Sequence, residues 1–284
     1  MMAAPRGTLG PGAVLREHWP EYVIEAWALG VFMICAGVFS TLLGYPESPL
    51  LKIVPSEHLR RAVIGVAMGL TAIALIYSPW GKRSGAHMNP AVTLTFLRLG
   101  RIARWDAVFY IAAQFIGGCL GVLLTAAVLR DAFTVAPVHY VATLPGPAGP
   151  AGAFVAEFVI SALLMAVILR VSNTPKLAPF TGVCAGAMVA IYITVEAPLS
   201  GMSMNPARSF ASAAPAGLWR HLWVYFLAPV LGMQAAAAWH VFRHGPKSVA
   251  CAKLLHPPEQ RCIHCGFTPD PQARNPSAAT GALQ

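Results

Sequence analysis

A tripeptide suited to starting a helix occurs twice in the 284-residue chain, as Asn89, Pro90 and Ala91 and again as Asn205, Pro206 and Ala207. In each copy the Asn side-chain oxygen can cap the first turn, and proline is pre-set for the first helical position. An Asn amide N–H would also be offered to a passing solute. Two such starts meeting at a bilayer midplane would point two positive helix ends at one pore, which repels cations.

The segments before the two tripeptides also match. Ser84-Gly-Ala-His-Met88 precedes the first copy, and Ser200-Gly-Met-Ser-Met204 precedes the second. One copy alone would be weak, because a tripeptide arises by chance. The alternative that both Asn residues only cap helices explains the local structure but not the duplication. The matching contexts therefore predict a duplicated pore element.

Three of the charged residues in or beside the apolar stretches are candidates for a functional or supporting role. Arg208 directly follows the second tripeptide, and an intramembrane charge indicates a functional site unless the side chain snorkels to the surface. Glu25 and Glu157 occupy comparable places in two apolar stretches. We expect them to hold loop N–H groups through charge-assisted hydrogen bonds. We find no nucleophile with a matching base, so no enzymatic activity is expected.

The C-terminal region carries a second set of chemically capable residues, in the pattern Cys-x4-His-x5-Cys-x2-Cys. Its members are Cys251, His256, Cys262 and Cys265. Structural zinc takes four thiolate or imidazole ligands, and cytosolic thiols stay reduced. The sequence therefore predicts zinc in the tail, although transport itself would need no cofactor. The prolines nearby favour the alternative of a disordered tail with incidental thiols.

The composition indicates a membrane protein. Hydrophobic residues make up 56% of the chain and charged residues only 11%, against about 25% charged in soluble domains. The net charge of +9 is spread around the apolar stretches rather than gathered on one face. That spread excludes nucleic acid as the expected partner and leaves membrane lipid.

Six apolar stretches approach the ~20 residues that cross a bilayer. They are 21–43, 60–80, 105–129, 152–171, 179–198 and 221–242. Two shorter helical segments, 89–99 and 205–214, begin at the tripeptides and are too short to cross, which is typical of re-entrant half-helices lining a cavity. The predicted fold is an all-α membrane protein with six transmembrane helices and two re-entrant half-helices.

The predicted helices fall into two halves with the same order, and three crossings per half give the halves opposite orientations. This is an inverted repeat. The predicted parts are an N-terminal cytosolic segment 1–20, a first repeat 21–143, a linker 144–150, a second repeat 151–243 and a C-terminal cytosolic tail 244–284. The linker is assigned from its prolines and glycines, which end helices.

The basic residues predict the orientation. With both termini cytosolic, fourteen basic residues lie inside and five outside, as the positive-inside rule requires. The inside set is Arg6, Arg16, Lys82, Arg83, Arg98, Arg101, Arg104, Arg170, Lys176, Arg243, Lys247, Lys253, Arg261 and Arg274, and the outside set is Lys52, Arg60, Arg61, Arg130 and Arg220. We expect a multi-pass protein of the cell (inner) membrane.

The tripeptides with their flanks, the two glutamates and Ala112-Ala-Gln-Phe-Ile-Gly-Gly118 together resemble the aquaporin, or major intrinsic protein, family. The resemblance covers about residues 20–243. It implies a passive channel for water and small neutral solutes that excludes protons and ions, assembled as a homotetramer with one pore per subunit.

The resemblance also implies a narrow selectivity filter formed by Met68, Ile193, Met202 and Arg208. Tyr192 is the alternative to Ile193 at the second of these positions. The resemblance assigns His87 to the cytoplasmic vestibule of the pore. The alternative is that His87 has only a structural role. Water-selective members usually carry an aromatic residue, a His and a small residue in the filter. Glycerol-conducting members usually carry two aromatics and a Gly, with an Asp after the Arg. This chain fits neither pattern, so the preferred solute stays open.

Three hypotheses remain. The first is an open channel for water and other small uncharged solutes. The second is a structural membrane protein whose pore is closed by Met68, Ile193 and Met202. The third is a channel gated by a metal- or redox-sensing tail.

Overall fold

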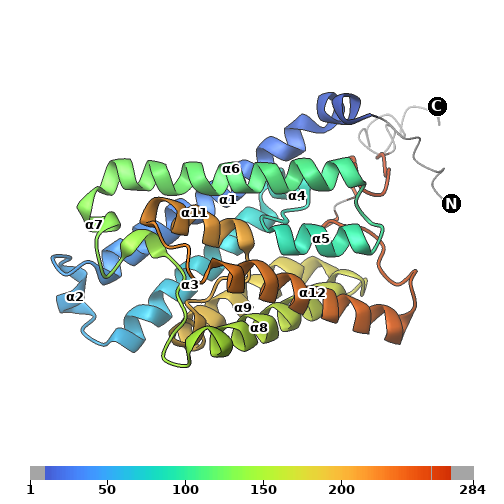
Figure 1. The fold of residues 1–284 in the computed structure, drawn as a ribbon. Coiled ribbons are helices and arrows are strands. Elements are labelled where there is room, and N and C mark those ends of the chain that lie inside the picture. Colours follow the sequence, from blue (N-terminus) through green and yellow to red (C-terminus); the bar gives the residue numbers. More distant parts are fainter. Residues whose placement is uncertain (1–9, 257, 270–284) are drawn as a thin grey trace, which may run out of the picture.

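The computed structural model describes residues 10–256 and 258–269, and within them every regular element is helical (Figure 1). In this described part of the chain, six helices are long and apolar enough to cross a membrane. They are α1 Pro11–Gly44, α3 Glu57–Tyr77, α6 Arg104–Leu129, α8 Gly149–Ser172, α9 Thr181–Val195 (continuing the 3-10 turn η2, Ala178–Phe180) and α12 Leu222–His244. The predicted all-α membrane fold is confirmed.

The shorter elements lie between these spans. They are α2 Leu50–Ile53, α4 Pro79–Ser84, α5 Pro90–Arg98, α7 Asp131–Thr134, η1 His139–Val141, α10 Ala197–Ser200 and α11 Pro206–Ala216. Figure 1 shows α5 and α11 entering the bundle from opposite ends and approaching each other near its middle. These are the two half-helices, and each begins at the proline of an Asn-Pro-Ala tripeptide.

The packing follows the inverted repeat. Helix α1 packs along α6, and α8 packs along α12, which are the corresponding pairs of the two halves. Helices α3 and α9 pack together across the halves. They come close at Gly69 and Gly186, where a Cβ on Gly69 would lie 2.5 Å from the Gly186 carbonyl oxygen. Small residues at such crossings let membrane helices come into backbone contact.

Several predicted helix boundaries differ from the structure by a few residues or more, and α1 and α8 are two examples. Helix α1 starts at Pro11, about three turns before the predicted span, because a proline at the first helical position favours a start there. Pro20 lies inside this helix, and Figure 1 shows its first turns bent away from the rest. Proline removes an internal hydrogen bond, which explains the bend. Helix α8 starts at Gly149, so the connection before it ends earlier than predicted.

Candidate functional site: a pore with two different ends

The two asparagines cap the half-helices. The side-chain oxygen of Asn89 accepts a hydrogen bond from the N–H of Ala91 (2.8 Å), and that of Asn205 accepts from Ala207 (3.1 Å) and Arg208 (3.2 Å). Both asparagines have extended backbones, as helix caps do. Each cap thereby satisfies one or two of the first N–H groups of its half-helix, which have no partner inside the helix.

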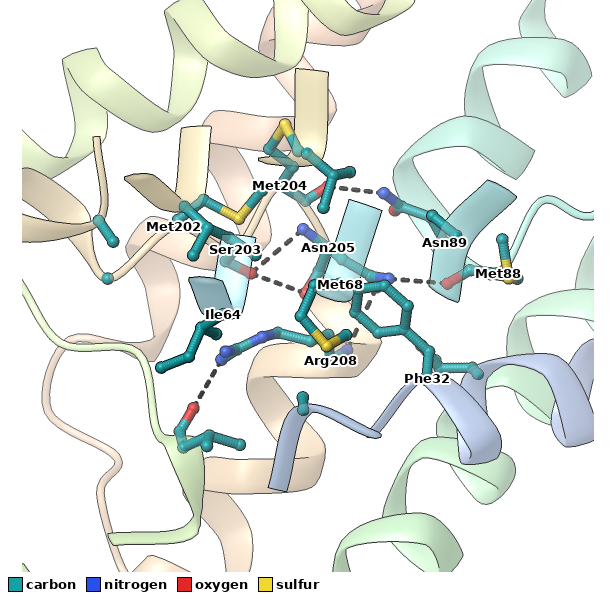
Figure 2. Close-up of a pocket in the computed structure, with 18 of the residues that line it drawn as sticks. Phe32, Ile64, Met68, Met88, Asn89, Met202, Ser203, Met204, Asn205 and Arg208 are labelled. Carbon is teal, nitrogen blue, oxygen red and sulfur yellow. Dashed lines mark hydrogen bonds between the residues drawn. The ribbon is translucent and has the colours of Figure 1, made fainter. Parts of the chain in front are cut away.

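The same two side chains join the halves reciprocally (Figure 2). The amide of Asn89 donates to the Met204 carbonyl, and the amide of Asn205 donates to the Met88 carbonyl, each at 2.7 Å. Each amide has two N–H groups. Among the residues that the structure describes, the second N–H of each has no protein acceptor, and both asparagines line the cavity.

The loop before each half-helix follows the same unusual path. Gly85 and Gly201 have φ angles of 106° and 82°, and Met88 and Met204 have φ angles of 50° and 54°. Left-handed backbone at non-glycine residues costs about 1–3 kcal/mol and persists only where surrounding contacts enforce it. Two buried glutamates provide those contacts.

Glu25 and Glu157 are fully buried, and each holds one loop. Glu25 accepts from the Ser84 hydroxyl (2.8 Å) and from the N–H groups of His87 (3.1 Å) and Met88 (2.7 Å). Glu157 accepts from the Ser200 hydroxyl (2.8 Å) and from the N–H groups of Ser203 (2.6 Å) and Met204 (2.7 Å). Bonds to a carboxylate are about twice as strong as neutral ones.

Sequence reasoning missed a second pair of supports. Tyr110 donates to the Ser84 carbonyl (2.8 Å), and Tyr225 donates to the Ser200 carbonyl (2.6 Å). Both tyrosines lie near the start of the last long helix of their half, and that shared position was the available signal. Gln114 bridges helices by donating to Glu25 (2.9 Å) and Thr93 (3.2 Å).

A cavity of about 410 Å³ runs past both asparagines, and its walls include Met68, Ile193, Met202 and Arg208. Of the two candidates for the second filter position, Ile193 lines this cavity and Tyr192 does not. Figure 2 shows Met68 beside Arg208, with Ile64 one turn away. Apart from Arg208, these filter side chains are apolar. Arg208 Nη1 donates to the Val141 carbonyl (2.9 Å), which fixes the guanidinium against the loop before α8.

A second arginine also lines the cavity. Arg61 lies two turns before Met68 on α3, at the end of the cavity away from the tail. The spacing of 61, 64, 68 and 72 puts these residues on one helix face, and all four line the cavity. The sequence contained part of this signal, because residues four and seven positions before Met68 share its helix face, but which face lines the cavity depends on how α3 is oriented.

The opposite end of the cavity is bounded by His87 and by the tail. His87 Nδ1 lies 3.0 Å from the Thr93 hydroxyl oxygen, and Nε2 lies 2.8 Å from the Ala252 carbonyl oxygen. A carbonyl only accepts, so Nε2 carries the proton and Nδ1 faces the hydroxyl. Both ring nitrogens are therefore engaged, and the ring offers no free polar atom to a solute. Leu254 lines this end of the cavity.

The four cysteine and histidine residues of the tail lie together. The ligand atoms of Cys251, His256, Cys262 and Cys265 are all within 4.8 Å of one another. Val249, Ala252, Leu254 and Ile263 around them are buried. The disordered alternative therefore does not describe residues 245–256 and 258–269, because their apolar side chains pack against the helices. The rest of the predicted tail, from residue 270, lies outside the described residues.

Hydrogen bonding within the cluster shifts its acid–base behaviour. A hydrogen bond from Cys251 lowers the pKa of both Cys262 and Cys265. The hydrogen bond with Cys262 raises the pKa of His256 to about 9. Burial lowers the pKa of the neighbouring His264 to about 4, so that ring is neutral at pH 7. Thiolate character of this kind is what metal ligation requires.

Six spanning helices, two half-helices that meet within the bundle and a cavity between them define a membrane channel. The major intrinsic protein family model matches residues 15–240, most of the chain. The chain belongs to that family, whose members are small-solute channels and not enzymes.

Individual proteins that are similar to this chain support the same family assignment. The chain is 42% identical over 171 residues to a putative aquaporin NIP4-1 of Arabidopsis thaliana, a match that spans 60% of this chain and 58% of that protein. It is 33% identical over 229 residues to aquaporin NIP2-3 of Zea mays, spanning 79% of this chain and 73% of that one. The fold is similar to an aquaglyceroporin structure from Plasmodium falciparum, with a TM-score of 0.64 and 20% identity over 78% of this chain and 95% of that one.

Proposed function

We propose that this channel conducts water and other small uncharged solutes passively and excludes protons and ions. The observation that carries the proposal is the reciprocal pairing of Asn89 and Asn205, each of which caps one half-helix and keeps an N–H group for the cavity. Two positive helix ends at the same point oppose cations, hydronium included. A water molecule there accepts from the asparagines and turns its own hydrogens outward, which interrupts a proton wire.

In this proposal Met68, Ile193, Met202 and Arg208 form the selectivity filter, and Glu25 and Glu157 keep the asparagine loops in place. Arg208 is the polar side chain of that set, so it adds a donor and a positive charge where the path is narrow. Arg61 adds positive charge at the same end. Neutral solutes that accept a hydrogen bond pass, and cations are repelled.

The proposed setting is a homotetramer with one pore per subunit in the cell (inner) membrane, with both termini in the cytosol. The excess of basic residues on the side of the termini supports this orientation. Transport of this kind needs no cofactor in the pore.

Stopped-flow swelling of proteoliposomes tests the proposal. Vesicles containing the full chain, measured both with bound zinc and after metal removal, should in at least one of these two states respond faster than empty vesicles to an osmotic gradient and to a gradient of glycerol, urea or ammonia, without added proton conductance. Membranes no more permeable than empty ones under every condition would leave the closed, structural alternative standing.

We expect the apolar filter to slow water. A water molecule that enters a site with few donors gives up hydrogen bonds, and each unmade bond costs about 1–3 kcal/mol. Replacing Ile193 with His and Met68 with Phe should therefore raise the ratio of water to larger-solute permeability. The measurement compares parent and double variant in the same vesicles. A parent already fast for water and closed to every other solute would show that these side chains do not set selectivity.

A further inference from the structure

We infer that the tail cluster binds one zinc ion and that the zinc-bound tail is a plug closing the pore at His87. The inference rests on the proposed channel function and adds to it a metal-dependent gate. The plug consists of Val249–His256 and Gln260–Phe267.

The cluster has the composition and size of a zinc site. Three thiols and one imidazole are ligands that select zinc over magnesium or calcium. Cys251 Sγ lies 3.5 Å from Cys262 Sγ, and His256 Nε2 lies 3.1 Å from Cys265 Sγ. A tetrahedral site with Zn–S bonds of about 2.3 Å separates its sulfur atoms by about 3.8 Å. The four ligands therefore need only small shifts to enclose the ion.

The backbone around the last two ligands is a tight turn. The Cys262 carbonyl accepts from the Gly266 N–H (3.0 Å), and the Cys262 N–H donates to the Phe267 carbonyl (2.9 Å). Gly266 has φ 76°, a conformation that favours glycine. This turn points both thiols of Cys-x2-Cys to the same side.

The plug separates the pore from the solvent beyond it. Leu254 lines the pore cavity and also lines a second cavity on the other side of the tail, between the tail and the α8–α9 connection. Leu255 lines only the second cavity. A solute leaving the pore past His87 therefore meets the segment that carries Leu254.

The plug is bonded to the loop that shapes the pore. Leu254 N–H donates to the Gly85 carbonyl (3.2 Å), and Lys253 Nζ donates to the Lys82 carbonyl (3.0 Å). His264 Nε2 lies 3.0 Å from the Ser84 carbonyl oxygen, and its ring stacks on His87 with centroids 5.8 Å apart. The tail thus contacts the same loop that Glu25 holds.

The ligands bracket these contacts. Cys251 directly precedes the segment that bonds His87 and lines the pore, and His264 lies between Cys262 and Cys265. The described part of the tail after α12 contains no helix or strand, so few of its own backbone bonds hold it in shape. Short segments of this kind commonly depend on a structural metal. Removal of zinc therefore releases both contact points at once.

The test uses the full chain, purified without a metal-binding tag and reconstituted in proteoliposomes. We expect about one zinc per chain by elemental analysis and slow solute-driven swelling. A zinc chelator on both faces of the membrane should raise the swelling rate about tenfold, because the tail moves from mostly docked to mostly free. Added zinc should restore the slow rate.

Two pairs of variants separate the metal from the plug. Cys262→Ser should lose zinc and swell fast without chelator, whereas Cys184→Ser, a thiol within α9, should behave as the parent. Leu254→Ala should keep zinc and still swell fast, because it shortens the side chain at the end of the pore. Leu255→Ala, its neighbour outside the pore, should keep zinc and stay slow.

Three other results would each contradict at least one part of the inference. Protein without stoichiometric zinc overturns the metal site. Fast, chelator-insensitive swelling of zinc-loaded parent overturns the plug and leaves the channel standing. Permeability equal to that of empty vesicles in the parent, the chelated protein and Leu254→Ala overturns the proposed channel function together with the gate.

Discussion

Replacing Glu25 or Glu157 with Ala should prevent formation of a stable channel. Each substitution leaves a serine hydroxyl and two loop N–H groups buried without an acceptor. Each such unpaired group costs about 1–3 kcal/mol. The total is a large part of the free energy of unfolding of an ordinary domain, which is about 5–15 kcal/mol. We expect a large loss of monodisperse protein after mild heating, measured by size-exclusion chromatography in detergent.

Two further variants keep this prediction falsifiable. Glu25→Gln retains an acceptor oxygen and should fold better than Glu25→Ala, but with slower transport, because the amide nitrogen faces a loop N–H. Glu47→Ala removes an exposed carboxylate and should behave as the parent. Normal heat resistance of both alanine variants at Glu25 and Glu157 would show that the carboxylates do not hold the loops.

Replacing Arg208 with Val should make the pore leak cations or protons while the protein still folds. The guanidinium brings a fixed positive charge to the cavity wall beside Met68, and removing it lowers the barrier to cations. Valine also frees the Val141 carbonyl that Arg208 binds (2.9 Å). We expect at least about a tenfold rise in cation leak, which corresponds to about 1.4 kcal/mol. The measurement is decay of a pH or potassium gradient in proteoliposomes, under the conditions that give the fastest solute swelling.

Arg208→Lys is the matched control. Lysine keeps the charge but lacks the planar fork of the guanidinium. We expect it to block cations nearly as well as the parent and to pass neutral solutes at a changed rate. A folded Arg208→Val variant that leaks no more than the parent would remove Arg208 from the cation barrier.

Helix number, half-helices and the repeat could be predicted because each leaves a local signal in the sequence. An apolar stretch of about 20 residues indicates a transmembrane helix. The Asn-Pro pairs at 89–90 and 205–206 indicate helix starts, because Asn caps a helix and Pro suits its first position. The helix ends were less accurate. The α1 start at Pro11 depends on cap and packing choices that hydropathy does not measure.

The pore-lining set could be predicted only in part. Met68 followed from the resemblance, while Arg61 and Ile64 needed the orientation of α3, which its contact with α9 fixes. Tyr110 and Tyr225 share a position near the start of the last long helix of each half, but their carbonyl partners lie in distant loops that this position does not specify. The same holds for the engagement of both His87 nitrogens, one of which faces Ala252, 165 residues away.

The sequence by itself determined the membrane class, the inverted repeat and the four ligand types of the tail, because composition, duplication and spacing are one-dimensional properties. Only the tertiary structure decided what the two ends of the pore contain. The reciprocal bonds of Asn89 and Asn205 require two chain segments to meet in space. The position of the tail against His87 depends on where α12 ends and on where the chain packs after it. Contacts between residues far apart in the chain arise from packing of the whole bundle, which sequence spacing does not encode.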